Sequence, residues 1–120
     1  MILIVEDHLD TGSILTRLLK RRGFEAIAVS SGSAALSLLQ KTRPQVIILD
    51  KMMPGMDGLE VLRAIRSDAA VADIPVILYS ANTDPAEMEK ARRLGAQDYL
   101  IKASTPWERV CDTIRRYARA

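Results

Sequence analysis

The stretch from Gln45 to Gly58, QVIILDKMMPGMDG, constrains the fold of this chain more than any other. Its four apolar residues, Val46 to Leu49, are rich in β-branched side chains and stand between Pro44 and a Pro-Gly loop. A run of this kind predicts a strand that is buried on both faces of a sheet. Asp50 follows the run directly. The sequence therefore places a carboxylate at the carboxyl end of a strand, where open α/β sheets form their ligand sites.

Short apolar runs and helical segments alternate along the whole chain. The apolar runs predict five strands, at residues 1–5, 24–29, 46–49, 74–79 and 98–101. The segments between and after them predict five helices: from Leu9 to Arg22, between Ser33 and Arg43, from Asp57 through Ile65, from Asp84 to Gly95, and from Thr105 through Tyr117. This alternation implies right-handed crossovers and a parallel α/β sheet with helices on both faces. It does not by itself set the strand order.

Three of the predicted helices begin with a recognisable start signal. Asp57 and Asp84 are expected to cap their helices, each with a glutamate three residues later as the capping-box partner. Thr105-Pro106 repeats this signal before the last helix, whose apolar face carries Cys111.

Composition limits the classes of protein to which the chain can belong. The 120 residues are enough for one domain with its own core, and 17 basic against 15 acidic residues give a net charge of only +2. This charge does not favour binding to nucleic acid or to a membrane surface. No apolar run approaches the roughly 18 residues of a membrane span. A single cysteine and an N-terminus without a basic, signal-like segment favour a cytoplasmic location.

Polar side chains end four of the predicted strands. They are Glu6 and Asp7, then Asp50, Ser80 and Lys102. If the first and third strands are neighbours, the three carboxylates converge at one edge of the sheet. Two unit charges about 4 Å apart repel by roughly 4 kcal/mol at an effective dielectric near 20. A hard divalent cation relieves this repulsion, and Mg²⁺ suits it best because it accepts a few carboxylates and keeps several waters.

A lysine and a hydroxyl group complete this predicted site. Lys102 supplies a compact positive charge opposite the metal, and Ser80 supplies a hydrogen-bond donor. Metal, ammonium and hydroxyl groups around one carboxylate are typical of phosphoryl transfer, in which positioning and charge neutralisation do most of the catalysis.

Four motifs in the chain resemble those of the receiver domain of two-component response regulators. They are IVED at 4–7, DKMMPGMDG at 50–58, YSA at 79–81 and GAQDYLIK at 95–102. Each is weak alone, but their order and spacing are specific. The resemblance covers residues 1–120 as one receiver domain. It implies the flavodoxin-like (βα)5 fold with strand order 2-1-3-4-5, as in chemotaxis regulators.

The resemblance also implies a role for each site residue. Asp50 would accept a phosphoryl group from a histidine kinase or phosphotransfer protein, and Lys102 would pair with that group. Asp7, Asp50 and the backbone carbonyl of Met52 would bind Mg²⁺, while Glu6 would act through a metal-bound water.

Phosphorylation would then change the packing of the domain. Ser80 would bond a phosphoryl oxygen, and Tyr99 would rotate inward behind it. The surface formed by the fourth helix, fifth strand and fifth helix would repack and contact a second copy or an effector. The domain would promote only its own phosphorylation and dephosphorylation, and would not act as an enzyme on a separate substrate. It would bind neither nucleic acid nor a membrane directly.

The chain departs from the receiver pattern after Lys102 and, more mildly, at Glu6, where the family more often has an aspartate. Ala103 follows Lys102, where the family usually has a proline after a cis bond, so the sequence leaves open whether this bond is cis or trans. Met52 and Asn82 occupy positions that influence acyl phosphate hydrolysis in this family. Met52 has no polar group to orient an attacking water, which predicts a long-lived phosphoryl group.

Two other functions compete with this interpretation. A pseudo-receiver would use the same fold as an interaction module that does not depend on phosphorylation, but the acidic and basic residues at the strand ends argue against it. A nucleotide-binding enzyme of similar architecture would need a glycine-rich phosphate loop, and no such motif follows any predicted strand. His8, the single histidine, is expected to be an ordinary surface residue.

Overall fold

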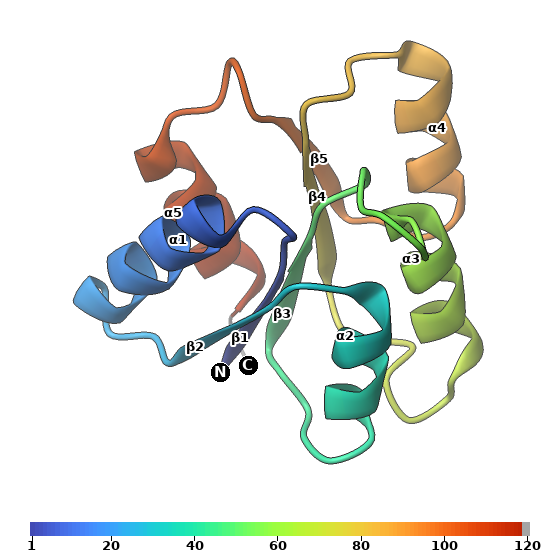
Figure 1. Ribbon diagram of the computed structural model, residues 1–120, viewed down its shortest axis with the longest axis horizontal. Coiled ribbons are helices and arrows are strands. Elements are labelled where there is room, and N and C mark those ends of the chain that lie inside the picture. The colour runs from blue at the N-terminus through green and yellow to red at the C-terminus, as the bar shows by residue number, and fades with distance from the viewer. Residues whose placement is uncertain (119–120) are drawn as a thin grey trace.

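The computed structural model describes residues 1–118, in which five strands alternate with five helices (Figure 1). The strands are β1 (Ile2–Val5), β2 (Ala26–Val29), β3 (Val46–Leu49), β4 (Val76–Ser80) and β5 (Asp98–Ile101). The helices are α1 (Leu9–Arg21), α2 (Gly32–Leu39), α3 (Gly58–Ser67), α4 (Pro85–Arg93) and α5 (Trp107–Tyr117). In residues 1–118, no helix is long and apolar enough to cross a membrane.

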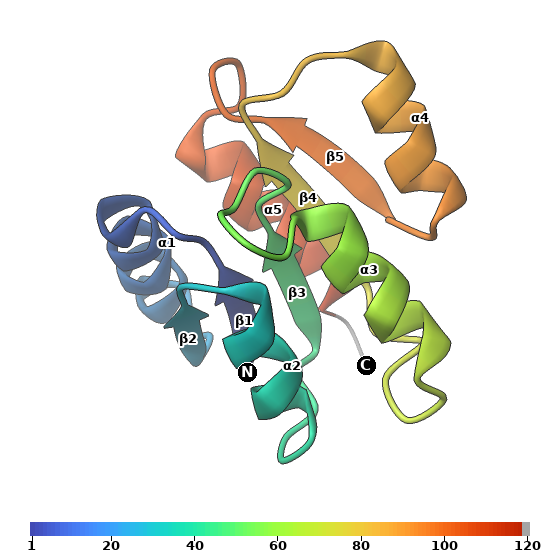
Figure 2. The same ribbon diagram turned by 45° about the vertical axis from the view of Figure 1, so that its right-hand side comes forward.

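All five strands are parallel and form one sheet of order β2-β1-β3-β4-β5. The predicted fold class and strand order are therefore confirmed. Figure 2 shows the sheet with helices in front of it and behind it. Because β1 lies between β2 and β3, the residues that follow β1 and β3 are neighbours in space, as the convergence of the three carboxylates requires.

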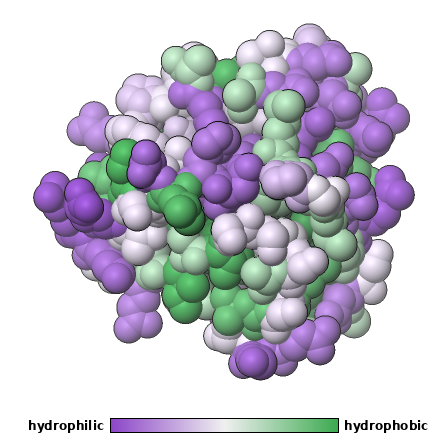
Figure 3. Space-filling model, viewed as in Figure 1, coloured by the Kyte–Doolittle hydropathy of each residue, from purple (hydrophilic) through white to green (hydrophobic). Residues whose placement is uncertain are grey.

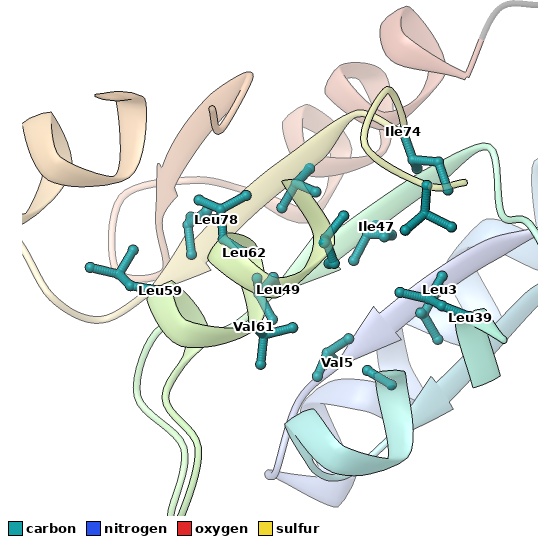
Figure 4. Packing of buried hydrophobic residues seen from close by; sticks show 14 of the residues in the cluster. Leu3, Val5, Leu39, Ile47, Leu49, Leu59, Val61, Leu62, Ile74 and Leu78 are labelled. Carbon is teal, nitrogen blue, oxygen red and sulfur yellow. The ribbon is translucent and has the colours of Figure 1, made fainter. Parts of the chain in front are cut away.

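Successive strand residues point to opposite faces of the sheet, and each face has its own apolar cluster. Leu3, Ile47 and Leu78 belong to the cluster beneath α2, α3 and α4, part of which is seen from close by in Figure 4. Ile4 and Ile48 belong to the cluster beneath α1 and α5. The strands β1, β3 and β4 are buried at every position, which explains why they appear in the sequence as continuous apolar runs.

Backbone hydrogen bonds place the polar residues at one edge of this sheet. The Asp50 N–H donates to the Val5 carbonyl oxygen at 3.0 Å, and the Lys102 N–H donates to the Ser80 carbonyl oxygen at 2.9 Å. The Glu6 N–H donates to the Val29 carbonyl oxygen at 3.0 Å. The ladder thus continues into the residues that follow the strands and sets their positions relative to one another.

Several predicted boundaries were wrong by a few residues. β2 begins at Ala26 because the Phe24 N–H instead donates to the Leu19 carbonyl oxygen at the end of α1. β4 begins at Val76, directly after Pro75, which has no N–H to donate to the ladder. The helical pattern of the sequence also predicts that Ile14 shares the apolar face of α1 with Leu15 and Leu19, but its side chain is 38% exposed.

The predicted helix starts are partly confirmed. Asp57 accepts hydrogen bonds from the N–H groups of Leu59 and Glu60, and Asp84 accepts one from Ala86. Within residues 1–118, neither capping-box glutamate returns a hydrogen bond to its capping aspartate; the Asp84 N–H donates to Asn82 Oδ1 instead.

Thr105 does not cap α5. Pro106 occupies the N-cap position with an extended backbone, φ −63° and ψ 153°, and no side chain bonds the first turn. The helix still buries its predicted apolar face, with Val110, Cys111 and Ile114 fully enclosed and Trp107 and Tyr117 packed at its ends.

A pair of glycine substitutions tests how tightly the loop after β3 packs. In Gly58→Ala, the added Cβ would lie 2.3 Å from the Asp50 carbonyl oxygen and 2.7 Å from Lys51 Cα. Because both neighbours are backbone atoms, we expect a loss of roughly 1–3 kcal/mol in the free energy of unfolding, measured by urea denaturation.

Gly12→Ala is the matched control. Its Cβ would make an ordinary 3.4 Å contact with Ala28 Cβ. Because alanine favours the helix more than glycine does, the free energy of unfolding should increase by up to about 1 kcal/mol. Equal effects of the two substitutions would contradict the described packing.

Candidate functional site

Three carboxylates meet at the carboxyl ends of β1 and β3, as predicted. Glu6, Asp7, His8 and Asp50 each offer one potential ligand atom, and these atoms all lie within 4.8 Å of one another. Glu6 is 4% exposed and Asp50 is 3% exposed, so two of the three carboxylates are almost completely removed from water. Burial of charged groups at this density is destabilising unless other charges compensate.

Lys102 supplies the compensating charge. Its Nζ atom lies 2.6 Å from Glu6 Oε1 and 3.3 Å from Asp50 Oδ2. The sequence predicted the lysine opposite the metal in a site around Asp50, and in the structure its ammonium group contacts that carboxylate. Its shorter contact with Glu6 was not predicted. No peptide bond in residues 1–118 is cis, so the bond from Lys102 to Ala103 is trans.

The close approach of these buried charges shifts the pKa values of Asp50, Glu6 and Lys102. Burial, together with the neighbouring Glu6 carboxylate, raises the pKa of Asp50 to about 6, although Lys102 and the Met52 N–H act against this rise. Burial also disfavours the charged form of Glu6, but hydrogen bonds from Lys102 and from the His8 N–H outweigh it and lower the pKa of Glu6. For Lys102, burial is outweighed by the two carboxylates, and its pKa is raised.

Asp7 makes the site fit a divalent cation. Its Oδ1 atom is buried and has no hydrogen-bond partner in the described part of the chain, and His8 Nδ1, 3.4 Å away, does not satisfy it. An unsatisfied carboxylate oxygen next to the buried carboxylates of Glu6 and Asp50 is a costly arrangement by itself. Mg²⁺ prefers such oxygen ligands, and the residues present therefore fit this ion.

The loop after β3 holds the Asp50 side chain in place. The Met52 N–H donates to Asp50 Oδ1 at 3.1 Å, and the Gly58 N–H donates to the Lys51 carbonyl oxygen at 2.8 Å. The Met52 side chain is 56% exposed, whereas Met53 is buried in the core. Met52 therefore presents a flexible apolar side chain to solvent beside the carboxylate.

A second group of residues near this edge of the sheet, from β4, β5 and the loop after β4, is joined by hydrogen bonds. It consists of Ser80, Asn82 and Tyr99. The buried Ser80 Oγ accepts a hydrogen bond from the Asn82 N–H at 3.1 Å. Tyr99, which is partly exposed, donates from its hydroxyl to the Asn82 carbonyl oxygen at 2.9 Å. Asn82 Oδ1 accepts from the Asp84 N–H, so the amide side chain supports the start of α4.

His8 contacts the site more closely than the sequence suggested. Its side chain is 69% exposed, as expected for a surface residue. Its Nδ1 atom nevertheless lies 3.2 Å from Glu6 Oε2, and its backbone N–H lies at the same distance from that oxygen. The position of His8 directly after Glu6 and Asp7 in the sequence was the feature from which this contact could have been predicted.

Comparison with known proteins identifies the family. Residues 2–114 match the model of the response regulator receiver domain. The chain belongs to this receiver family. It is a signalling module, and its acidic cluster is consistent with a receiver magnesium site.

Relatives and solved structures agree with this assignment. The chain is 34% identical to the DNA-binding response regulator MtrA of Mycobacterium tuberculosis, over 98% of this chain and 50% of that protein. It is 37% identical to the probable transcriptional regulator ycf27 of Guillardia theta, over 99% of this chain and 47% of that protein. The chain thus spans about half the length of these relatives. The Vibrio cholerae chemotaxis protein CheY4 superposes with a TM-score of 0.90 at 28% identity, over 97% of this chain and 96% of CheY4.

The raised pKa of Asp50 predicts a specific dependence of stability on pH. An unfolded aspartate titrates near 3.9, so between about pH 4 and 6 Asp50 is protonated to a greater extent in the folded chain than in the unfolded chain. The contribution of Asp50 to the free energy of unfolding should therefore fall as the pH rises through this range. Asp50→Asn cannot ionise, and without metal we expect its stability relative to the parent to rise by roughly 2–3 kcal/mol from pH 4 to pH 7.5.

Urea unfolding of both proteins in a chelator at several pH values measures this difference. A difference that stays constant with pH would show that Asp50 titrates normally.

Proposed function

We propose that this chain is a phosphorylation-dependent signalling switch and that Asp50 accepts the phosphoryl group. The observation that carries the proposal is the buried Asp50 carboxylate, held between Glu6, Asp7 and the Lys102 ammonium group. An Asp50 oxygen would attack the phosphorus atom of a phosphohistidine on a histidine kinase or phosphotransfer protein. The phosphorus–nitrogen bond would break, and the imidazole would leave with the electron pair.

Asp7, Asp50 and the Met52 carbonyl would hold Mg²⁺, with Glu6 acting through a water. Bound there, the ion would neutralise charge on the transferring oxygens. The unsatisfied Asp7 Oδ1 supports this assignment. Lys102 would lie opposite and stabilise the same charge, since its ammonium group is already beside Asp50 Oδ2.

The switch would start from Ser80. A phosphoryl group on Asp50 brings strong acceptor oxygens, and the Ser80 hydroxyl would turn to donate to one of them. This would change the hydrogen bonds that join Ser80, Asn82 and Tyr99, and Tyr99 would move inward. The expected result is a repacked α4–β5–α5 surface that binds a second copy or a downstream effector.

A partner carrying phosphohistidine would need access to the site from the side of α1. A groove of about 870 Å³ begins beside Glu6 and extends along α1 to β2. Leu9, at its start, is 77% exposed. Figure 3 shows apolar surface set among polar side chains on this side of the molecule. An open groove with an exposed leucine at its start supports docking of a protein partner on this side.

We further propose that residues 1–120 are one receiver domain that works in the cytoplasm and contacts neither DNA nor a membrane itself. The net charge of +2 supports this, because it provides little attraction to either polyanion. MtrA is described as DNA-binding, and this chain matches only half of it.

The alternative is a pseudo-receiver that binds partners without phosphorylation. The carboxylates and Lys102 argue against it, because an interaction module has no need to bury these charges together.

Labelling with a small phosphodonor separates the two functions. With acetyl phosphate and Mg²⁺, intact-mass spectrometry should find one added phosphoryl group on the parent chain and none on Asp50→Asn. Asp10→Asn, which removes an exposed carboxylate on α1, should be labelled like the parent. Failure to label the parent, or equal labelling of Asp50→Asn, would reject Asp50 as the acceptor.

The exposed Met52 side chain leads to a prediction about the lifetime of the phosphoryl group. Met52→Asn introduces an amide that can orient a water towards the acyl phosphate, so dephosphorylation should become severalfold faster. Met52→Leu adds no polar group and should leave the rate within about twofold of the parent. Loss of labelled protein after donor removal measures both rates. Equal rates for the two variants, or a parent half-life of a few seconds or less, would contradict the assigned role.

A further inference from the structure

The ring of Tyr79 lies next to the Lys102 ammonium group. Tyr79 belongs to β4, directly before Ser80, and it is 4% exposed. Lys102 Nζ lies over this ring, 5.6 Å from its centroid. This distance is within the roughly 6 Å at which a cation is attracted to the negative face of an aromatic ring.

The backbone fixes the ring and the lysine relative to each other. β4 and β5 are neighbours, with Tyr79 opposite Leu100 and Ser80 opposite Ile101. The Lys102 N–H then donates to the Ser80 carbonyl oxygen at 2.9 Å. Lys102 therefore comes one residue after the last β4–β5 pair, and the Tyr79 ring comes from the neighbouring strand β4.

The ammonium group has two kinds of partner. Glu6 Oε1 at 2.6 Å and Asp50 Oδ2 at 3.3 Å contact it as carboxylates, and Tyr79 contacts it with a ring face. The Lys102 side chain is 20% exposed, so water competes little for these contacts. The aromatic ring carries no ionisable charge in this contact. Its attraction for the ammonium group therefore remains when Glu6 or Asp50 changes its protonation state.

Trp107 packs against Tyr79. The two ring centroids are 6.0 Å apart, with the planes tilted by 58°, an ordinary aromatic pair geometry. Trp107 is the first residue of α5, directly after the loop that contains Ala103. The tyrosine ring thus contacts both the first residue of α5 and the lysine.

We propose that Tyr79 is a positioning residue whose ring face holds the Lys102 ammonium group beside Asp50. Its consequence for phosphoryl transfer rests on the proposed function, whereas the contact itself does not. Burial raises the pKa of the Tyr79 hydroxyl, so the side chain stays neutral and its aromatic face remains the interacting group. The competing explanation is that Tyr79 only fills volume in the apolar cluster beneath α1 and α5, and a leucine would serve as well.

Two substitutions distinguish these explanations. Tyr79→Phe keeps the ring, and Tyr79→Leu keeps an apolar side chain without it. Initial rates of labelling by acetyl phosphate at saturating Mg²⁺ should be near the parent rate for Tyr79→Phe and about two- to tenfold lower for Tyr79→Leu. Tyr117→Leu removes another aromatic ring packed against the same cluster, and it should leave the rate unchanged.

Nuclear magnetic resonance provides a readout that does not depend on phosphorylation. The ε-methylene protons of Lys102 should be shifted upfield by the ring current in the parent and in Tyr79→Phe, but not in Tyr79→Leu. The parent should also show cross-relaxation between these protons and the protons of the Tyr79 ring. This measurement uses the parent alone and does not depend on whether a variant folds.

The outcomes separate the two proposals. Absence of the upfield shift and the cross-relaxation in the parent overturns the positioning role. Where the parent is labelled, an equal labelling rate for Tyr79→Leu overturns it as well. A parent that shows both spectroscopic signs but accepts no phosphoryl group overturns the proposed function and leaves the ring–lysine contact established.

Discussion

The repulsion between two buried carboxylates, Glu6 and Asp50, is the interaction on which the site depends. The parallel sheet brings them together because β1 and β3 are neighbours, and the surrounding core excludes the water that would otherwise screen them. Lys102 offsets part of this repulsion, yet the pKa of Asp50 remains near 6. Folding therefore leaves a site with unbalanced negative charge, and a divalent cation or a change in protonation completes it.

Two groups of contacts lead away from this site. Ser80, Asn82 and Tyr99 are joined by hydrogen bonds, and Asn82 also bonds the residue that caps α4. On the other side, Lys102 lies over Tyr79, which packs against the first residue of α5. These contacts connect the site around Asp50 to the starts of both α4 and α5, so a change at Asp50 can affect either helix.

Much of the fold and most of the site could be predicted from the sequence. Buried strands appear as continuous apolar runs, so the polar residues at their ends, including Glu6 and Asp50, could be identified without a structure. The strand order could not be derived from alternation alone and depended on the receiver motifs. Thr105 was misassigned as a cap because the sequence does not reveal that Pro106 adopts the N-cap geometry. The contacts of Lys102 with Glu6 and Tyr79 depend on the conformations of side chains at the ends of three different strands, and no local pattern encodes them.

The central claim is that the three carboxylates form one divalent-cation site that includes Asp50. Calorimetric titration with Mg²⁺ tests it most directly, using the parent, Asp7→Asn and Asp50→Asn. We predict one saturable site in the parent, and much weaker binding in both variants. At pH 6 binding to the parent should also release a fraction of a proton, because the ion favours the ionised form of Asp50. Absence of saturable binding, or binding that survives both substitutions unchanged, would contradict the account.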